Sequence, residues 1–190
     1  MDGKITALIK SPKILVFAGP NGSGKSTISD AWKIVGLYIN ADEIKKRRDC
    51  TVLDAALEAE KLRELCLYEV RDFTFETVLS TERNLDLLAR AKSAGFYIES
   101  VFVLTADAEL NVFRVRSRVI GGGHDVPAEK IRARYRKSLA NIHKLIALSD
   151  ECYVIDNTEE PFVIYAKDAT GQYVSENRYW PADKLKTLLG

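Results

Sequence analysis

The sequence predicts an α/β fold: a parallel five-stranded sheet flanked by helices, with a C-terminal β-hairpin. Short apolar runs of strand length alternate with longer segments of helical periodicity, as in a parallel sheet whose strands are joined by crossover helices. A glycine-rich loop follows the first run directly and precedes a helix-like segment, an order typical of such sheets. The 190 residues, 46% of them hydrophobic, suit one core, so we expect residues 1–190 to form a single domain.

Three strands are expected in the first half of the chain, at residues 13–18, 36–40 and 73–77. Residues 14–18 of the first strand form a continuous apolar run, as expected in a parallel sheet that helices cover. Helix-periodic segments at 25–33 and 53–71 separate the strands and make each connection long enough for parallel pairing.

The second half continues the alternation and then changes character. Strands are expected at 96–104 and 151–155, with helices at 84–93, 108–120 and 128–148. Gly95 is a C-terminal helix stop, and Thr105 or Asp107 can cap the next helix. In residues 161–190, two β-type runs flank a turn at Gly171, which predicts a hairpin, and a helix at 182–189 closes the chain.

Composition excludes several function classes. A formal net charge of +1, from 28 basic and 27 acidic residues, provides no global field for nucleic acid or a membrane surface. The three cysteines have no metal-type spacing and their odd number gives no disulfide framework, so we expect reduced, buried thiols. No apolar stretch spans a membrane and no signal-peptide core is present, which predicts a cytoplasmic protein without membrane contact.

The most specific motif is Gly-Pro-Asn-Gly-Ser-Gly-Lys-Ser-Thr at residues 19–27, which matches the phosphate-binding pattern G-x-x-x-x-G-K-[ST] between a strand and a helix. Backbone N–H groups and the helix N-terminus of such a loop form an anion-binding concavity, which predicts a bound nucleotide with Mg²⁺. Lys25 is expected at the β- and γ-phosphates and the Ser26 hydroxyl at Mg²⁺. The other expected nucleotide contacts in the loop are Gly19, Asn21, Gly22, Ser23, Gly24 and Thr27.

Polar residues also follow three strands at the edge where ligands bind in open α/β sheets. Asp42 is expected to be the base that takes a substrate hydroxyl proton, although a helix N-cap role suits it equally. Glu76 and Thr77 are expected at the substrate; a strand-end turn is the alternative, and Glu76 could instead be an outer-shell magnesium group. Asn157, after the fifth strand, is expected near the nucleotide base.

Arginines surround a second glycine-rich segment, which we expect to act as a lid over about residues 118–130. Guanidinium groups neutralise charge on a moving phosphoryl group, and Arg118 and Arg134 are the favoured catalytic pair. Arg114 is expected at the nucleotide, and His124 in the lid at a phosphate. A solvated basic face is the alternative for the remaining arginines. Apolar residues on two sides of helix 108–120 predict that this helix is wedged into the structure.

Taken together, these motifs resemble the zeta-toxin-like family of P-loop kinases. The matching segments are residues 19–27, 40–42, 75–77, 111–119, 122–127 and 134–139. The resemblance implies a P-loop NTPase fold of the nucleotide-kinase type, with ATP and Mg²⁺ at Lys25 and Ser26. It further implies that Asp42 is the catalytic base, that Glu76 and Thr77 hold the acceptor, and that an antitoxin protein is a partner.

In the best-known toxins of that family, the acceptor is the nucleotide sugar UDP-N-acetylglucosamine. The resemblance therefore implies a small-molecule acceptor of this kind, phosphorylated on a hydroxyl. The present chain is shorter than those toxins, and its lid contains Gly-Gly-Gly-His in place of a longer arginine-bearing segment. The identity of the acceptor stays open at this point.

Two other classes of protein share the phosphate loop. An ATP-hydrolysing switch that acts through a protein partner is one, but residues 154–157 lack the glutamate that follows the strand in a hydrolytic site. A polynucleotide kinase is the other. The balanced charge argues against a large nucleic-acid footprint, whereas the arginines between residues 114 and 136 favour one.

Overall fold

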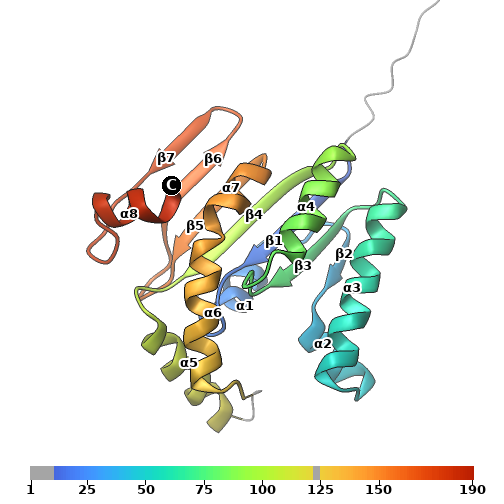
Figure 1. The fold of residues 1–190 in the computed structure, drawn as a ribbon, viewed down its shortest axis with the longest axis horizontal. Helices are drawn as coiled ribbons and strands as arrows, with labels where there is room; N and C mark the ends of the chain where they lie inside the picture. Colours follow the sequence, from blue (N-terminus) through green and yellow to red (C-terminus); the bar gives the residue numbers. More distant parts are fainter. Residues whose placement is uncertain (1–10, 122–124) are drawn as a thin grey trace, which may run out of the picture.

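The computed structural model describes residues 11–121 and 125–190, and within them seven strands form one sheet that is flanked by eight helices (Figure 1). The strands are β1 (Lys13–Ala18), β2 (Leu37–Ile39), β3 (Phe73–Thr77), β4 (Tyr97–Leu104), β5 (Glu151–Asp156), β6 (Phe162–Asp168) and β7 (Gly171–Val174). The helices are α1 (Lys25–Asp30), α2 (Ala41–Arg48), α3 (Val52–Tyr68), α4 (Arg83–Ser93), α5 (Ala108–Ile120), α6 (Ala128–Ala140), α7 (Ile142–Leu148) and α8 (Ala182–Leu189).

Strands β1 to β5 are all parallel, so their carboxyl ends lie at one edge of the sheet. The strand order is β2-β3-β1-β4-β5-β6-β7, and Val16 of β1 lies between Phe75 of β3 and Ser100 of β4. The predicted five-stranded parallel sheet is therefore confirmed. Because β1 is central, the loop that leaves its carboxyl end is surrounded by the ends of neighbouring strands.

The C-terminal hairpin is also confirmed, and it extends the sheet. β6 pairs antiparallel with β5, and β7 pairs antiparallel with β6, with an irregularity between Val154 and Ile155. The sequence predicts the hairpin through its own turn at Gly171. It does not predict that the hairpin joins the main sheet, because an edge pairing is made by backbone groups that every residue carries.

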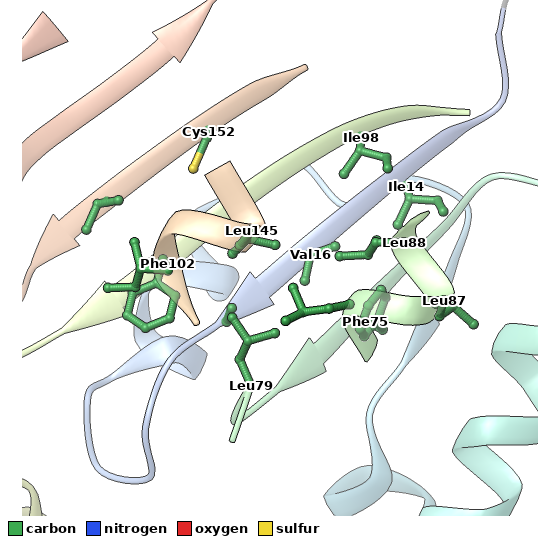
Figure 2. Packing of buried hydrophobic residues seen from close by; sticks show 14 of the residues in the cluster. Ile14, Val16, Phe75, Leu79, Leu87, Leu88, Ile98, Phe102, Leu145 and Cys152 are labelled. Carbon is green, nitrogen blue, oxygen red and sulfur yellow. The ribbon is translucent and has the colours of Figure 1, made fainter. Parts of the chain in front are cut away.

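Buried side chains fill both faces of the sheet. Helices α3, α4, α7 and α8 cover one face, and α1 covers the other. Figure 2 shows Leu88 of α4 and Leu145 of α7 beside Ile14 and Val16 of β1, and all four side chains are fully buried. A strand that is apolar on both faces is stable only between two such layers, which explains its unbroken apolar run.

Two helical segments differ from the predicted elements. The predicted helix 128–148 is divided at Asn141 into α6 and α7, and the Asn141 amide donates to the carbonyl O of Leu79 at 3.0 Å. Helix α2 is absent from the prediction, because none of its residues is buried and it has no apolar stripe. The Asn40 side chain stabilises α2 by accepting from the backbone N–H of Asp42 at 2.9 Å.

The expectation that helix α5 is wedged into the structure is wrong. Val112 and Val115 are buried and pack against Ile131 of α6. Phe113 and Ile120, on another side of the helix, are 66% and 89% exposed. Only one of the two apolar stripes is therefore part of the core, because one side of α5 packs against α6 and, among the described residues, Phe113 and Ile120 stay exposed.

The three cysteines are free thiols, as expected. Cys66 and Cys152 are buried, whereas Cys50 is only half-buried, so burial was predicted correctly for two of the three. Burial raises the pKa of the Cys152 thiol to about 11, which keeps it protonated and unreactive. Across the described residues, no helix combines the length and apolar character that crossing a membrane requires.

Truncation of Leu88 tests the packing of α4 on β1. We expect Leu88→Ala to lower the free energy of unfolding by about 2–5 kcal/mol, because it leaves a cavity in a fully buried layer. The matched control is Phe113→Ala, at an exposed apolar position, with an expected change within about 0.5 kcal/mol. Urea denaturation measures both, and equal losses would contradict this assignment of the core.

Candidate functional site

The backbone of the loop between β1 and α1 lies so close to neighbouring residues that two of its glycines have no room for a side chain. Gly22 and Gly24 have φ values of +81° and +93°, in the left-handed region that favours glycine. A Cβ atom on Gly24 would lie 2.1 Å from Nδ2 of Asn157, and one on Gly22 would lie 2.5 Å from the carbonyl O of Asn111. These two glycines are therefore required both by backbone conformation and by space.

Residues from three other elements hold this loop. The Asn157 amide, after β5, donates to the carbonyl O of Ser23 at 2.8 Å. Nη1 of Arg134, on α6, donates to Oδ1 of Asn21 at 3.1 Å. The backbone N–H of Gly19 donates to the carbonyl O of Thr77 at 3.2 Å. The structure therefore brings the predicted residues Asn157, Arg134 and Thr77 to the predicted loop.

Lys25, the first residue of α1, folds back over the loop. Its Nζ donates to the carbonyl O of Gly19 at 2.7 Å and to that of Pro20 at 3.2 Å. Burial lowers the pKa of Lys25 to about 8, the carboxylates of Glu76 and Asp42 oppose this shift, and Arg118 and Arg134 add to it. Four predicted charged residues from four separate elements therefore lie within electrostatic range of one ammonium group.

Glu76, near the end of β3, is held by hydrogen bonds. The Tyr38 hydroxyl donates to its Oε1, and Oγ of Ser29 lies 3.3 Å from the same oxygen. Nδ2 of Asn40 in turn donates to the Tyr38 hydroxyl at 3.3 Å. Burial raises the pKa of Tyr38 to about 12, so the phenol keeps the proton that it donates.

Tyr38 and Ser29 are site residues that the sequence does not predict. Tyr38 occupies a strand position with the same parity as Asn40, so strand alternation places both on one side of β2. Ser29 follows Ser26 by about one turn of α1, and its Oγ lies 3.1 Å from the Ser26 carbonyl O. Periodicity could have indicated these neighbours, but only the pairing of β2 with β3 brings them to Glu76.

Asp42 lies in the first turn of α2 and is exposed. The alternative of an N-cap role does not apply to it, because Asn40 is the residue whose side chain caps this helix. The partial positive charge at the helix N-terminus stabilises the Asp42 carboxylate. Its side chain is exposed and lies within electrostatic range of Lys25.

Thr77 shows the turn role that was the alternative interpretation for it. Its Oγ1 accepts from the backbone N–H of Leu79 at 3.0 Å and from Nδ2 of Asn84 at 2.8 Å. Leu79 has a φ of +56°, which is uncommon for a residue with a side chain. Ser138 of α6 also donates to the carbonyl O of Val78 at 2.7 Å, so this turn is held from both sides.

The arginines occupy three different environments. Arg114 donates to the carbonyl O atoms of Asn157 and Thr158 at 2.8 and 3.0 Å and so holds the loop after β5. Arg132 forms ion pairs with Glu109 and Glu129, both at 2.6 Å, and belongs to the solvated face. Arg118 and Arg134 lie near Lys25, and their positive charges help to lower its pKa. The predicted phosphate contact of His124 lies outside the described residues.

No group of three or more His, Cys, Asp or Glu side chains suited to a metal ion occurs in the described part of the chain. The Ser26 side chain is exposed at the first turn of α1, beside Lys25. This donor set fits Mg²⁺ that is bound mainly by phosphate oxygens and water, since Mg²⁺ keeps several waters and needs few protein ligands.

No protein-family model matches the chain. An uncharacterized protein of Haemophilus influenzae is 30% identical over 132 residues, which cover 65% of this chain and 92% of that protein. A chain of the AvrRxo1-ORF1:AvrRxo1-ORF2 complex, determined with sulphate ions, matches 94% of this chain with a TM-score of 0.72 and 14% identity. The same complex determined with ATP also matches with a TM-score of 0.72.

The chain spans 64% of the length of that AvrRxo1 chain. A structure from the PezAT toxin–antitoxin system of Streptococcus pneumoniae matches 94% of this chain and 78% of its own, with a TM-score of 0.60 and 16% identity. At these identities the structural similarity shows the fold. The chain therefore belongs to the same protein family as the Haemophilus influenzae protein, and its fold is that of the zeta-toxin-like P-loop kinases.

Proposed function

We propose that this protein is an ATP-dependent small-molecule kinase, which transfers the γ-phosphoryl group of ATP to a hydroxyl of a nucleotide sugar, such as UDP-N-acetylglucosamine, or of a similar nucleotide-like acceptor. The observation that carries the proposal is the set of charges around Lys25. Two carboxylates, Glu76 and Asp42, and two guanidinium groups, Arg118 and Arg134, act on the pKa of this one lysine. Phosphoryl transfer to an alcohol needs both kinds of group at the same place.

The loop is built to receive phosphate. Lys25 Nζ is held by carbonyl groups of Gly19 and Pro20, and negatively charged phosphate oxygens are stronger acceptors for an ammonium group than these. The N-terminus of α1 adds backbone N–H groups that point toward the same place. Mg²⁺ at Ser26, when bound, neutralises charge on the phosphates. The structure of the AvrRxo1 complex with ATP supports ATP as the nucleotide.

Asp42 is proposed as the base. An exposed carboxylate near Lys25 can accept a hydrogen bond from the acceptor hydroxyl, orient its oxygen toward the γ-phosphorus and take its proton. Glu76 acts on the pKa of the same lysine, but its carboxylate is held by the Tyr38 hydroxyl. A carboxylate in a fixed position suits a residue that positions the phosphoryl acceptor. Arg118 and Arg134 neutralise the charge that spreads over the phosphoryl oxygens during transfer.

A protein partner is proposed as a regulator of this activity. The structural neighbours include the AvrRxo1-ORF1:AvrRxo1-ORF2 complex and a toxin–antitoxin system, which supports an antitoxin-like partner. Such a partner could act by covering the loop and Lys25.

A polynucleotide kinase is the second candidate. A chain of the Pnkp1/Rnl/Hen1 RNA repair complex matches 93% of this chain with a TM-score of 0.56. Helices α5 and α6 together carry eight Lys or Arg residues against two Glu. Transfer of label to the 5′-hydroxyl of single-stranded RNA, with a steep loss of rate as salt is added, would favour this candidate.

The proposed activity is tested with γ-labelled ATP and a metabolite extract, followed by purified UDP-N-acetylglucosamine. We expect label to appear on a small acceptor with the wild-type protein. We expect Asp42→Asn to reduce the turnover number by about 10²- to 10⁴-fold, because it removes the proton acceptor. ATP binding should be retained in Asp42→Asn and lost in Lys25→Ala. Unchanged transfer in a folded Asp42→Asn protein would refute the assigned base.

The lowered pKa of Lys25 predicts a pH dependence of ATP binding. Below a pH of about 8 the ammonium is protonated and attracts phosphate, and above it the neutral amine does not, so affinity for Mg·ATP falls as pH rises through about 8. Calorimetric titrations at several pH values measure this. Lys25→Arg is the matched control, because a guanidinium stays charged over this range and should show no such loss.

Loss of the Tyr38 hydroxyl tests the position of Glu76. A hydrogen bond to a charged group contributes about 1.5–3 kcal/mol, so Tyr38→Phe should lower kcat/KM for the acceptor by about ten- to a hundredfold while KM for ATP stays unchanged. The control is Tyr153→Phe, whose hydroxyl donates to Glu151 at 2.6 Å near the amino end of β5, whereas the loop lies at the carboxyl ends of the strands. Equal effects of the two substitutions would count against the role of Tyr38.

A further inference from the structure

Helix α3 has small residues on its inner face. Ala55, Ala59 and Cys66 are each 1% exposed and pack against the sheet. The helix lies at the β2 end of the sheet, beyond the edge strand, and its outer side faces away from the molecule in Figure 1. A helix in this place needs only one apolar face to be part of the fold.

The outer face of α3 nevertheless carries large apolar side chains. We call these residues the outer stripe: Leu53, Leu57, Leu65 and Tyr68, which are 68%, 45%, 46% and 86% exposed. With 3.6 residues per turn they fall within an arc of about 120°, opposite the inner face. Isolated exposed apolar residues are ordinary, but a stripe along one helix is typical of a surface that another helix covers.

The charged residues beside the outer stripe are placed symmetrically about Lys61. Lys61 is exposed at its middle and takes part in none of the ion pairs among the described residues. Glu58 and Glu64 lie three residues to either side of it. Each of these glutamates has one partner already: Glu58 lies 3.3 Å from Arg48, and Glu64 lies 2.5 Å from Arg90.

The apolar pattern of the outer stripe is similar when it is read from Lys61 toward either end of α3. Leu57 and Leu65 lie four residues before and after Lys61. Leu53 lies eight residues before Lys61 and Tyr68 lies seven residues after it, so the outer stripe is nearly symmetric about Lys61. A contact between two identical copies around a two-fold axis requires a surface that is complementary to itself, with residue i opposite j and j opposite i. A partner of different sequence would place no such demand on α3.

We propose that the outer stripe is a homodimer interface, in which two copies of α3 pack antiparallel around a two-fold axis at Lys61. Leu57 of one copy then packs against Leu65 of the other, and Leu53 packs near Tyr68. Lys61 reaches the glutamates at 58 and 64 of the second copy, because its long side chain can leave the axis while its methylene groups stay on the apolar surface. This proposal is independent of the proposed enzymatic activity.

The interface is expected to be weak. Stable interfaces bury about 800 Å² per partner, and a single helix pair is a small contact beside that. The dimer should therefore dissociate on dilution. The contact uses the outside of α3 and none of the residues that hold the phosphate loop, so it leaves the candidate site open.

Sedimentation velocity over a dilution series tests the dimer. We expect the mass to rise from 21.3 kDa toward twice that value as concentration increases. Leu57→Glu and Leu65→Glu should raise the dissociation constant at least about tenfold, because each places a carboxylate in the apolar contact. The matched control is Phe113→Glu, at a 66% exposed apolar position on α5, which should dimerise as the wild type does. A monomer at every concentration, or a dimer that survives Leu57→Glu, would overturn the proposal.

Oxidative crosslinking in a Cys50→Ser background tests the axis. Lys61→Cys should form a disulfide with its own copy, whereas Lys186→Cys on α8 should not. Leu57→Cys alone should remain largely uncrosslinked, but a mixture of Leu57→Cys and Leu65→Cys proteins should crosslink. A parallel pair of helices would give the opposite result, with Leu57→Cys linked to itself, and would refute the two-fold arrangement. Circular dichroism confirms that each variant is folded.

Discussion

The close contact between the phosphate loop and the end of β5 is the constraint on which the rest of the site depends. Asn157 can donate to the Ser23 carbonyl only because Gly24 has no side chain. The carbonyl of the same asparagine accepts from Arg114, so α5 is tied to the loop through one residue. A side chain at Gly24 would separate β1, β5 and α5 at the point where they meet.

The parallel sheet brings further functional residues close to this contact. Because β1 to β5 all end at one edge, residues far apart in the chain come close to Lys25 without long loops. Asp42 lies in the helix after β2, Glu76 is the penultimate residue of β3, and Arg118 and Arg134 come from the two helices after β4. Burial of the ammonium is the main cause of the lowered pKa of Lys25, and the two carboxylates only partly offset it.

Several polar residues near the loop hold the structure through hydrogen bonds to the backbone. Thr77 and Ser138 stabilise the turn after β3, and Arg114 stabilises the segment after β5. Tyr38 has an intermediate role, since its hydroxyl donates to Glu76 and so orients a carboxylate that acts on the pKa of Lys25. Residue types that suit catalysis thus also stabilise the structure. Their hydrogen-bond partners distinguish a structural role from a catalytic one.

The sequence by itself determined the α/β class, the five parallel strands and the phosphate loop, because apolar periodicity and the glycine spacing are local properties of the chain. It also indicated Asp42, Glu76, Arg118 and Arg134 as candidates through their places after strands and on helix flanks. Only the tertiary structure decided that Asn40 is the cap of α2, that Asn141 divides α6 from α7, and that Tyr38 meets Glu76. It likewise decided that α5 buries one apolar stripe and α3 exposes another. Each of these depends on which element lies opposite a side chain, and this is a property of the packed chain that no local pattern contains.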